Sequence, residues 1–305
     1  MKRNKEIKLK SNNPLLRRKG ARKETIGFLL LLPALASIII FKYVPILLGV
    51  FETFFNMSIV KLPGEFVGLS NYIRAFTDSQ FLNAFLHNAK AFFYSLTMNF
   101  WVPIAIAILI NELRRGKTVF RMLYFIPACA PSIAMTVLWK FFWQPDYGLA
   151  NYILSVFGLP AQMWLNSEKW VYFCIYFQGF VISGGMNMVI YLAALQDVPA
   201  ELYEAAMMDG AGIISRIRYI TLPGIKNVVV LMLTLAIISA FNVMENIMIL
   251  TGGGPANSTQ TMLLYAYQQA TNSMDYSYAM TMTTIIFVVT MILTIIFNRI
   301  TREKD

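Results

Sequence analysis

The sequence predicts an all-α, multi-pass membrane protein with six spanning helices, and three observations lead to this fold class. Hydrophobic residues make up 57% of the 305 residues, charged residues 14%, and the mean hydropathy is +0.56. A soluble domain carries about 25% charged residues, so this chain has too few polar groups to cover a globular surface in water. Six stretches reach the ~20 apolar residues that a spanning helix needs. Finally, the basic residues gather on alternate connecting segments.

The predicted spans divide the chain into a basic tail at 1–25, a membrane domain at 26–300 and a short C-terminus at 301–305. No signal peptide is expected, because the first apolar stretch is too long and no small-residue cleavage site follows it. Prolines inside the spans are tolerated where neighbouring helices satisfy the freed carbonyls. The six spans run over residues 26–50, 89–110, 119–142, 171–195, 228–250 and 279–300.

The distribution of basic residues predicts the orientation of the chain. With the N-terminus in the cytoplasm, the inside segments hold 20 of the 26 lysines and arginines, and the remaining six lie elsewhere. Cytoplasmic loops carry such an excess, so both termini are predicted in the cytoplasm, on the inner side of a cell membrane. Ten of the 20 lie in the tail directly before an apolar segment. This position is typical of a topology signal beside anionic lipid rather than of a nucleic-acid site.

The chain contains no motif of a catalytic centre. It has no Gly-rich phosphate loop, no metalloprotease motif and no Cys-x-x-Cys. One histidine, His87, and two cysteines in apolar runs, Cys129 and Cys174, predict no His-rich metal site and no disulfide framework. We therefore expect neither an enzyme nor a cofactor in this chain. Only Glu245 lies well inside a predicted span, and a proton-coupled carrier needs more buried ionisable groups than that. If the chain transports a solute, we expect the energy source to lie on another polypeptide.

The segment 197–224, between the fourth and fifth spans, predicts a short cytoplasmic helix with marked ends. Asp197 is the expected N-cap, and Pro199 suits the first turn, where its missing N–H costs nothing. Glu204 lies near the positive end of the helix dipole, and Gly210 can adopt the left-handed conformation that ends a helix. An ordinary loop helix at the membrane surface and a docking element for a partner both fit these features.

The same segment resembles a known family. Glu204-Ala205-Ala206, Asp209-Gly210-Ala211 and Leu222-Pro223 are similar to the EAA loop of bacterial ABC importer permeases. The similarity covers about residues 26–300 and extends to the sugar-importing branch, related to maltose and glycerol-phosphate permeases. The outer stretches that carry this further similarity are Gly68-Leu69-Ser70-Asn71-Tyr72 and Thr251-Gly252-Gly253-Gly254-Pro255, followed by Ser258-Thr259.

The resemblance implies a type I importer permease fold and a set of partners. These are a second permease in a heterodimer, two ATPase subunits that bind ATP and Mg, and an extracytoplasmic solute-binding protein. The loop helix would dock on the ATPase, whose two states shift the spanning helices between outward- and inward-facing forms. The residues expected to dock are Glu204, Ala205, Ala206, Asp209, Gly210 and Ala211.

Polar residues on two predicted spans are candidates for the solute pathway. Buried polar groups in a membrane are costly and tend to be functional, but hydrogen bonds between helices are an equally good explanation for each of them. Gly184 and Gly185 are expected to be a close-packing point. The candidates are Ser239, Asn242, Glu245 and Asn246 on one helical face of the fifth span, and Tyr176, Ser183 and Asn187 on the fourth.

The preferred function is therefore import of a sugar or oligosaccharide, as one permease subunit of an ATP-driven complex. A polyol or a glycerophosphodiester is the alternative solute. A stand-alone secondary transporter would need buried ionisable relays and an inverted repeat, and a membrane enzyme would need a titratable cluster near one interface. The sequence offers little of either.

Overall fold

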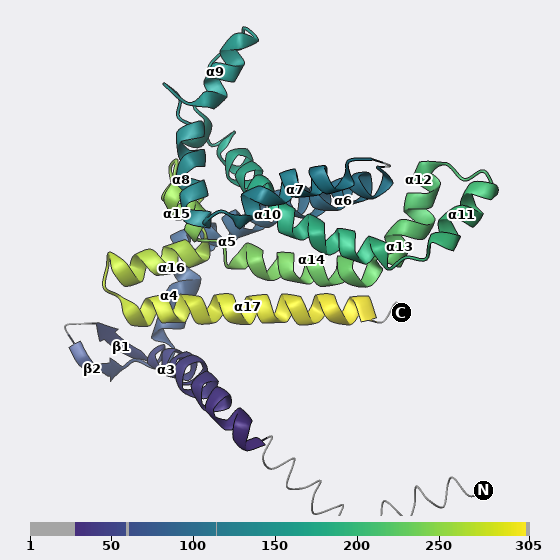
Figure 1. The fold of residues 1–305 in the computed structure, drawn as a ribbon. Helices are drawn as coiled ribbons and strands as arrows, with labels where there is room; N and C mark the ends of the chain where they lie inside the picture. Colours follow the sequence, from purple (N-terminus) through teal and green to yellow (C-terminus); the bar gives the residue numbers. More distant parts are fainter. Residues whose placement is uncertain (1–27, 59–60, 114, 303–305) are drawn as a thin grey trace, which may run out of the picture.

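The computed structural model describes residues 28–302, apart from residues 59, 60 and 114. The predicted basic tail at 1–25 and residues 303–305 lie outside the described residues. The described chain is mostly helical, as predicted, with one small hairpin (Figure 1). Its elements are η1 (Ile39–Tyr43), α3 (Val44–Glu52), β1 (Phe55–Ser58), β2 (Lys61–Phe66), α4 (Ser70–Thr77), α5 (Ser79–Ser95), η2 (Leu96–Trp101), α6 (Val102–Glu112), α7 (Lys117–Phe125), η3 (Ile126–Cys129), α8 (Ser132–Phe142), α9 (Leu149–Val156), η4 (Trp164–Asn166), α10 (Val171–Gln196), α11 (Ala200–Met208), α12 (Ile213–Arg216), η5 (Ile217–Thr221), α13 (Leu222–Gly224), α14 (Lys226–Phe241), α15 (Glu245–Leu250), α16 (Met262–Thr271) and α17 (Tyr276–Arg302).

Four helices in the described part are long and apolar enough to cross a membrane, and two bent helix pairs raise the number of candidate spans to as many as six. The four run over Phe28–Glu52, Ser79–Glu112, Val171–Gln196 and Tyr276–Thr301. Three of them match predicted spans to within a few residues. The second starts at Ser79, earlier than predicted, because Asp78 caps that end by accepting hydrogen bonds from the backbone N–H groups of Gln80 and Phe81.

The third predicted span is not one straight helix. Lys117–Cys129 and Ser132–Phe142 meet at an angle of 98°. Pro131 lacks the N–H that would continue the ladder, and the residue before it, Ala130, is extended with ψ of 150°. The sequence contained this proline, but proline also occurs inside continuous membrane helices, so its effect depended on the packing around it.

The fifth predicted span, 228–250, is also wrong in its extent. Helix α14 ends at Phe241, and α15 starts at Glu245 after a short break. Two distant side chains satisfy carbonyls that the break frees: Asn88 Nδ2 donates to the Ala240 carbonyl over 2.9 Å, and Thr261 Oγ1 donates to the Val243 carbonyl over 2.8 Å. The second bent pair is instead Ile213–Gly224 with Lys226–Phe241, at 72°.

Glycines let α7 and α10 approach closely, as predicted for Gly184 and Gly185. A Cβ on Gly185 would overlap the carbonyl oxygen of Tyr124 and lie 3.0 Å from the Cα of Phe125. A Cβ on Gly184 would lie 2.5 Å from the Tyr124 hydroxyl. Helices α6, α10, α14 and α17 lie side by side in the main bundle (Figure 1), and one buried cluster joins α6, α10 and α14 around Met188, Tyr191 and Met232.

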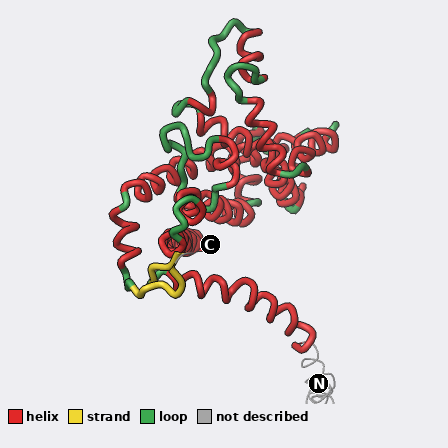
Figure 2. The backbone as a smooth tube through the Cα atoms, turned by 90° about the vertical axis from the view of Figure 1, so that its left-hand side faces the viewer, coloured by secondary structure: helices red, strands yellow, loops and turns green. Residues whose placement is uncertain are grey.

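The first helix, which includes η1 and α3, lies at the edge of this bundle and leads away from it (Figure 2). Its side chains are almost all exposed; Leu30 is 77% and Phe41 80% accessible. Its C-terminal end is anchored by the Asn71 side chain, which donates to the carbonyls of Thr53 and Phe55. This contact gives the Gly68–Tyr72 stretch a structural role. An apolar helix so exposed requires lipid or another subunit around it.

Candidate functional site

The segment between α10 and α14 projects beyond the ends of the bundle helices. Figure 1 shows α11 and α12 as a pair of short helices at the extremity of the molecule, past the ends of α6, α14 and α17. The segment is held from behind: the Tyr203 hydroxyl donates to Thr221 Oγ1 over 3.1 Å, and Gly224 packs against the side chain of Val198. The projection is therefore a folded corner rather than a loose loop.

Local sequence determines the end of α11, as predicted, but not its beginning. Gly210 has φ of +77°, its N–H donates to the Met207 carbonyl, and the Ala211 N–H donates to the Ala206 carbonyl. This pattern is a Schellman motif. Asp197 is not the N-cap that we predicted, because α10 continues to Gln196 and Asp197 caps its C-terminus. Pro199, with ψ of 129°, takes the N-cap position without a side-chain hydrogen bond.

The predicted docking residues lie together on this corner. Glu204, Ala205, Asp209 and Gly210 are exposed, and Ala206 and Ala211 are half-buried. Three large apolar side chains that sequence reasoning missed accompany them: Met207 is 52%, Met208 88% and Ile214 78% exposed. Apolar residues beside the motif in a predicted aqueous loop were the signal that could have revealed them. Together the residues form an apolar and acidic surface without a partner in the described chain.

The predicted polar face on the fifth span does not exist as one helical face, because the helix breaks within it. Ser239 lies on α14, Asn242 is its C-cap, and Glu245 is the first residue of α15. These three are exposed. Asn242 donates to the Ile238 carbonyl over 2.8 Å, whereas the Glu245 carboxylate forms no hydrogen bond or ion pair with the described residues.

Asn246 is directed elsewhere and joins α15 to α8. Its Oδ1 accepts from Thr136 Oγ1 over 3.1 Å, and Thr136 Oγ1 accepts from Gln178 Nε2 on α10 over 2.8 Å. Lys140, one turn after Thr136, donates to the Ile249 carbonyl over 2.8 Å. These contacts favour a role for Asn246 in hydrogen bonding between helices rather than in the solute pathway.

The three candidates on α10 also divide. Tyr176 is buried and stacks with Tyr94, with ring centroids 6.1 Å apart, and its hydroxyl has no hydrogen-bond partner among the described residues. Asn187 donates to the Asn99 carbonyl over 3.2 Å, a contact between helices. Ser183 is exposed and donates to the Gly179 carbonyl of its own helix. Ser183 thus remains available at a surface, and Asn187 packs.

A polar cluster around Asp78 joins two pairs of helices that lie far apart in the sequence. Asp78 Oδ2 accepts hydrogen bonds from the hydroxyls of Tyr265 (2.8 Å) and Tyr278 (2.6 Å). Arg74 pairs with Asp275 at 2.6 Å and lies over the Tyr278 ring, 3.8 Å from its centroid. These contacts connect α4 and the start of α5 to α16 and α17 around one carboxylate.

This cluster predicts a dependence of stability on pH. Burial raises the pKa of Asp78. Hydrogen bonds from Tyr278, Tyr265 and two backbone N–H groups together lower it by more than burial raises it, so the pKa lies below the ordinary value of 3.8. A depressed pKa contributes stability above the unfolded-state pKa and loses it as the pH falls through the folded-state value. We expect the melting temperature in detergent to decrease as the pH is lowered past about 4. The slope of melting temperature against pH in this acid range should be smaller in Asp78→Asn.

The control for this prediction is Asp146→Asn, which removes an exposed carboxylate that forms no hydrogen bond with the described residues. Its acid-side slope should equal that of the unmodified protein. Equal slopes in all three proteins would show that the Asp78 cluster does not contribute to acid stability.

No group of three or more His, Cys, Asp or Glu side chains that could hold a metal ion occurs among the described residues. The features that the described chain does present are a projecting corner, broken helices with polar residues at the breaks, and the polar cluster around Asp78.

Comparison with known proteins accounts for this combination. Residues 101–303 match the family described as "Binding-protein-dependent transport system inner membrane component". The trehalose/maltose transport system permease protein MalF of Thermococcus litoralis is 30% identical over 96% of this chain and 99% of that protein. The arabinooligosaccharides transport system permease protein AraP of Bacillus subtilis is 35% identical over 84% of this chain and 83% of its own length.

The fold is also similar to that of a solved ABC transporter. The crystal structure of a bacterial ABC transporter involved in the import of the acidic polysaccharide alginate contains a chain with a TM-score of 0.84 and 24% identity, over 93% of this chain and 98% of that one. The predicted ABC importer permease fold is therefore confirmed. The chain is a multi-pass membrane transport subunit rather than an enzyme, and it belongs to the family of inner membrane components of binding-protein-dependent transport systems.

Proposed function

We propose that this chain is one of two permease subunits of an ATP-driven importer for a carbohydrate. It forms half of the translocation pathway, and a second, similar permease forms the other half. Two separate ATPase subunits bind ATP and Mg and supply the energy, while an extracytoplasmic solute-binding protein delivers the sugar. Both termini and the α11–α12 corner lie on the cytoplasmic side.

The observation that carries this proposal is the projecting corner with Glu204, Asp209 and Gly210. Its helix buries none of its own residues in the bundle, yet it is braced by the Tyr203–Thr221 hydrogen bond. An exposed and braced helix can transmit the displacement of a partner to α10 and α14, which it connects. Exposed Met208 and Ile214 offer apolar contact area, and Glu204 offers a charge for a basic group of the ATPase.

The solute pathway in this proposal passes the break between α14 and α15. Transporter sites are typically built where membrane helices are discontinuous. Asn242 and Glu245 flank this break and are exposed. The amide can donate to and accept from sugar hydroxyls, and the carboxylate can accept from them. Ser239 on α14 and Ser183 on α10 are also exposed, and the proposal includes them among the pathway residues.

The chemistry of these residues favours a neutral carbohydrate over an anionic solute. Glu245 has no basic partner in the described chain, so an anionic glycerophosphate would meet an uncompensated negative charge at the break. The relatives named above carry trehalose, maltose or arabinooligosaccharides in their names, whereas a UgpA protein of Yersinia pestis, 30% identical over 92% of this chain, is named for sn-glycerol-3-phosphate. A polyol or glycerophosphodiester remains the alternative solute.

The experiment is to isolate the chain with its copurifying subunits, reconstitute them in liposomes and add the solute-binding protein loaded with one solute at a time. We expect ATP hydrolysis to rise several-fold with one sugar or oligosaccharide and to remain at its basal rate with glycerol-3-phosphate. The isolated chain should hydrolyse no ATP. ATP hydrolysis by this chain alone, or uptake driven by a proton gradient without ATP, would contradict the proposal.

A further inference from the structure

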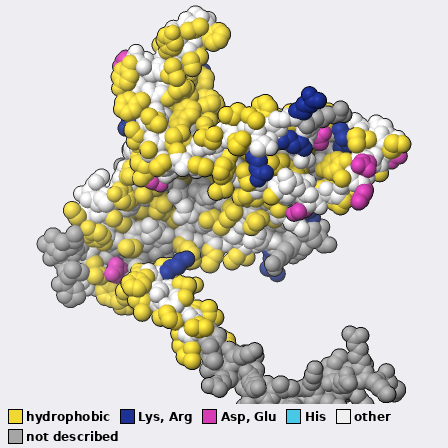
Figure 3. Space-filling view, viewed as in Figure 1, with side chains coloured by type: hydrophobic (Ala, Val, Ile, Leu, Met, Phe, Trp, Pro, Cys, Tyr) yellow, Lys and Arg dark blue, Asp and Glu magenta, His cyan; other side chains and the backbone are white. Residues whose placement is uncertain are grey.

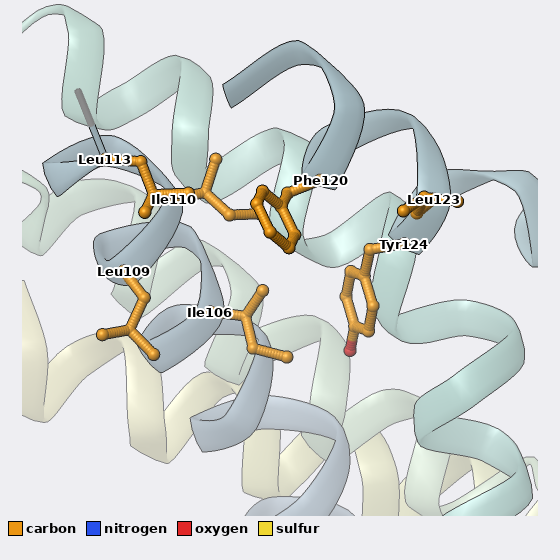
Figure 4. Close-up of a pocket in the computed structure, with 7 residues that line it drawn as sticks. All are labelled: Ile106, Leu109, Ile110, Leu113, Phe120, Leu123 and Tyr124. Atoms are coloured by element: carbon orange, nitrogen blue, oxygen red, sulfur yellow. The ribbon is translucent and has the colours of Figure 1, made fainter. Parts of the chain in front are cut away.

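An apolar groove lies between α6 and α7, and the end of α6 that borders it contacts α12 through the Glu112–Arg216 ion pair at 3.9 Å. Its volume is about 480 Å³, and Figure 4 shows side chains of both helices facing it. Leu109 and Phe120, on its opposite sides, are 65% and 53% exposed, so the groove opens to the outside of the described chain. Seven residues line it: Ile106, Leu109, Ile110, Leu113, Phe120, Leu123 and Tyr124.

One end of the groove is basic. Lys117 starts α7, and its ammonium donates to the Asn111 carbonyl over 2.6 Å, which places the charge where α6 ends. Arg121 follows one turn later, about 6 Å further along the helix. Arg115 lies in the connecting turn. All three are exposed, and Figure 3 shows Lys and Arg side chains gathered over this end of the molecule beside apolar surface.

Arg121 has no counter-charge among the described residues. It forms no hydrogen bond or ion pair with the described residues, although Phe120 and Met122 beside it are exposed apolar residues. A guanidinium at the edge of a membrane helix is stabilised when it reaches the interface and meets an anion there. A phosphate group suits it, because the planar guanidinium can donate two parallel hydrogen bonds to it.

We propose that the groove binds an anionic phospholipid such as phosphatidylglycerol. One acyl chain lies between Leu109 and Phe120, and the phosphate lies between Lys117 and Arg121. Basic pockets between membrane helices bind anionic headgroups in this manner. The inference requires only that the turn between α6 and α7 lies at a membrane surface, so it is independent of the proposed solute and of the ATPase.

The charge pattern favours lipid over a membrane helix as the occupant. Phe28–Glu52 is the least buried of the four long spanning helices in the described part, and it follows a tail with ten basic residues. If the equivalent helix of a second copy covered the groove with its N-terminus at the same membrane surface, it would bring those charges to the basic end of the groove. Like charges would then oppose the contact, whereas an anionic headgroup neutralises Lys117 and Arg121.

The test measures retained lipid by native mass spectrometry on the purified complex after incubation with phosphatidylglycerol or phosphatidylcholine. We expect Arg121→Gln to lower phosphatidylglycerol retention at least threefold and Arg121→Lys to retain most of it. Leu109→Trp, which fills the groove without changing charge, should lower it similarly. The matched control is Arg218→Gln, which removes an exposed arginine from the segment after α12 and should leave retention unchanged.

A photoreactive phenylalanine analogue at position 109 identifies the occupant directly. Crosslinking to phosphatidylglycerol supports the proposal. Crosslinking to a second permease subunit overturns it, as does equal retention of phosphatidylcholine or equal retention by all variants. If Arg121→Gln is not monodisperse on size exclusion, Leu109→Trp and the crosslink decide the question.

Discussion

Replacing Gly210 with valine is expected to lower coupled transport about tenfold or more while the protein still inserts and assembles its bundle. Gly210 has φ of +77° at the end of α11, and the left-handed region costs an L-residue about 1–2 kcal/mol, with β-branched residues among the least tolerant. The valine would unwind the Schellman motif and displace the α11–α12 corner. Solute-stimulated ATP hydrolysis and uptake in proteoliposomes measure the effect.

The control for this change lies two residues away. Gly212 has φ of −69° in extended backbone, and a Cβ there would meet nothing within 4 Å. Gly212→Val should therefore leave transport within about twofold of the unmodified protein. A second pair of variants tests the side-chain contact with the ATPase rather than the backbone conformation of the corner. Glu204→Ala should weaken coupling, and Glu201→Ala on the same helix should not. Undiminished coupling in Gly210→Val would exclude the corner as the docking element.

The second large effect is expected from Gly185→Ala, which acts on stability. The added methyl would overlap the Tyr124 carbonyl, a backbone atom that cannot move without shifting α7. Overpacking of this kind costs about 1–3 kcal/mol, occasionally more. It should outweigh the gain of up to about 1 kcal/mol that alanine brings to a helix interior. We expect the melting temperature in detergent to fall by several degrees, measured by loss of the monodisperse peak after heating.

Gly49→Ala is the matched substitution, because Gly49 also lies inside a membrane helix. Its Cβ would contact only the sulfur of Met280, at 3.3 Å, which is the end of a flexible side chain. The melting temperature of this variant should stay the same or rise slightly. Equal behaviour of the two variants would mean that α7 and α10 can separate without cost.

The parts of the fold that could be predicted from sequence are those that local apolar length determines. The spans at 171–195 and 279–300 agree with α10 and α17 because a continuous apolar stretch in lipid has no alternative to the helix. The breaks after Phe241 and before Pro131 could not be predicted in this way. The first depends on Asn88 and Thr261, which lie far away in the sequence and satisfy its carbonyls.

In the candidate site too, the features that local sequence determines could be predicted, and those that depend on distant contacts could not. The end of α11 was predictable because Gly210 and its neighbours form the motif by themselves. The start was not, since whether Asp197 caps α11 or ends α10 depends on how far α10 extends. The polar face of 239–246 assumed one continuous helix, and the break redirected Asn246 toward Thr136 while leaving Asn242 and Glu245 exposed.

The link between α8 and α15 has a mechanical consequence. Thr136 meets Asn246, and one turn later Lys140 meets Ile249, so the two segments run parallel and are joined at two levels. Each follows directly after a break in the backbone. A rotation at either break would therefore displace both segments together, while the Gln178–Thr136 hydrogen bond passes the displacement on to α10.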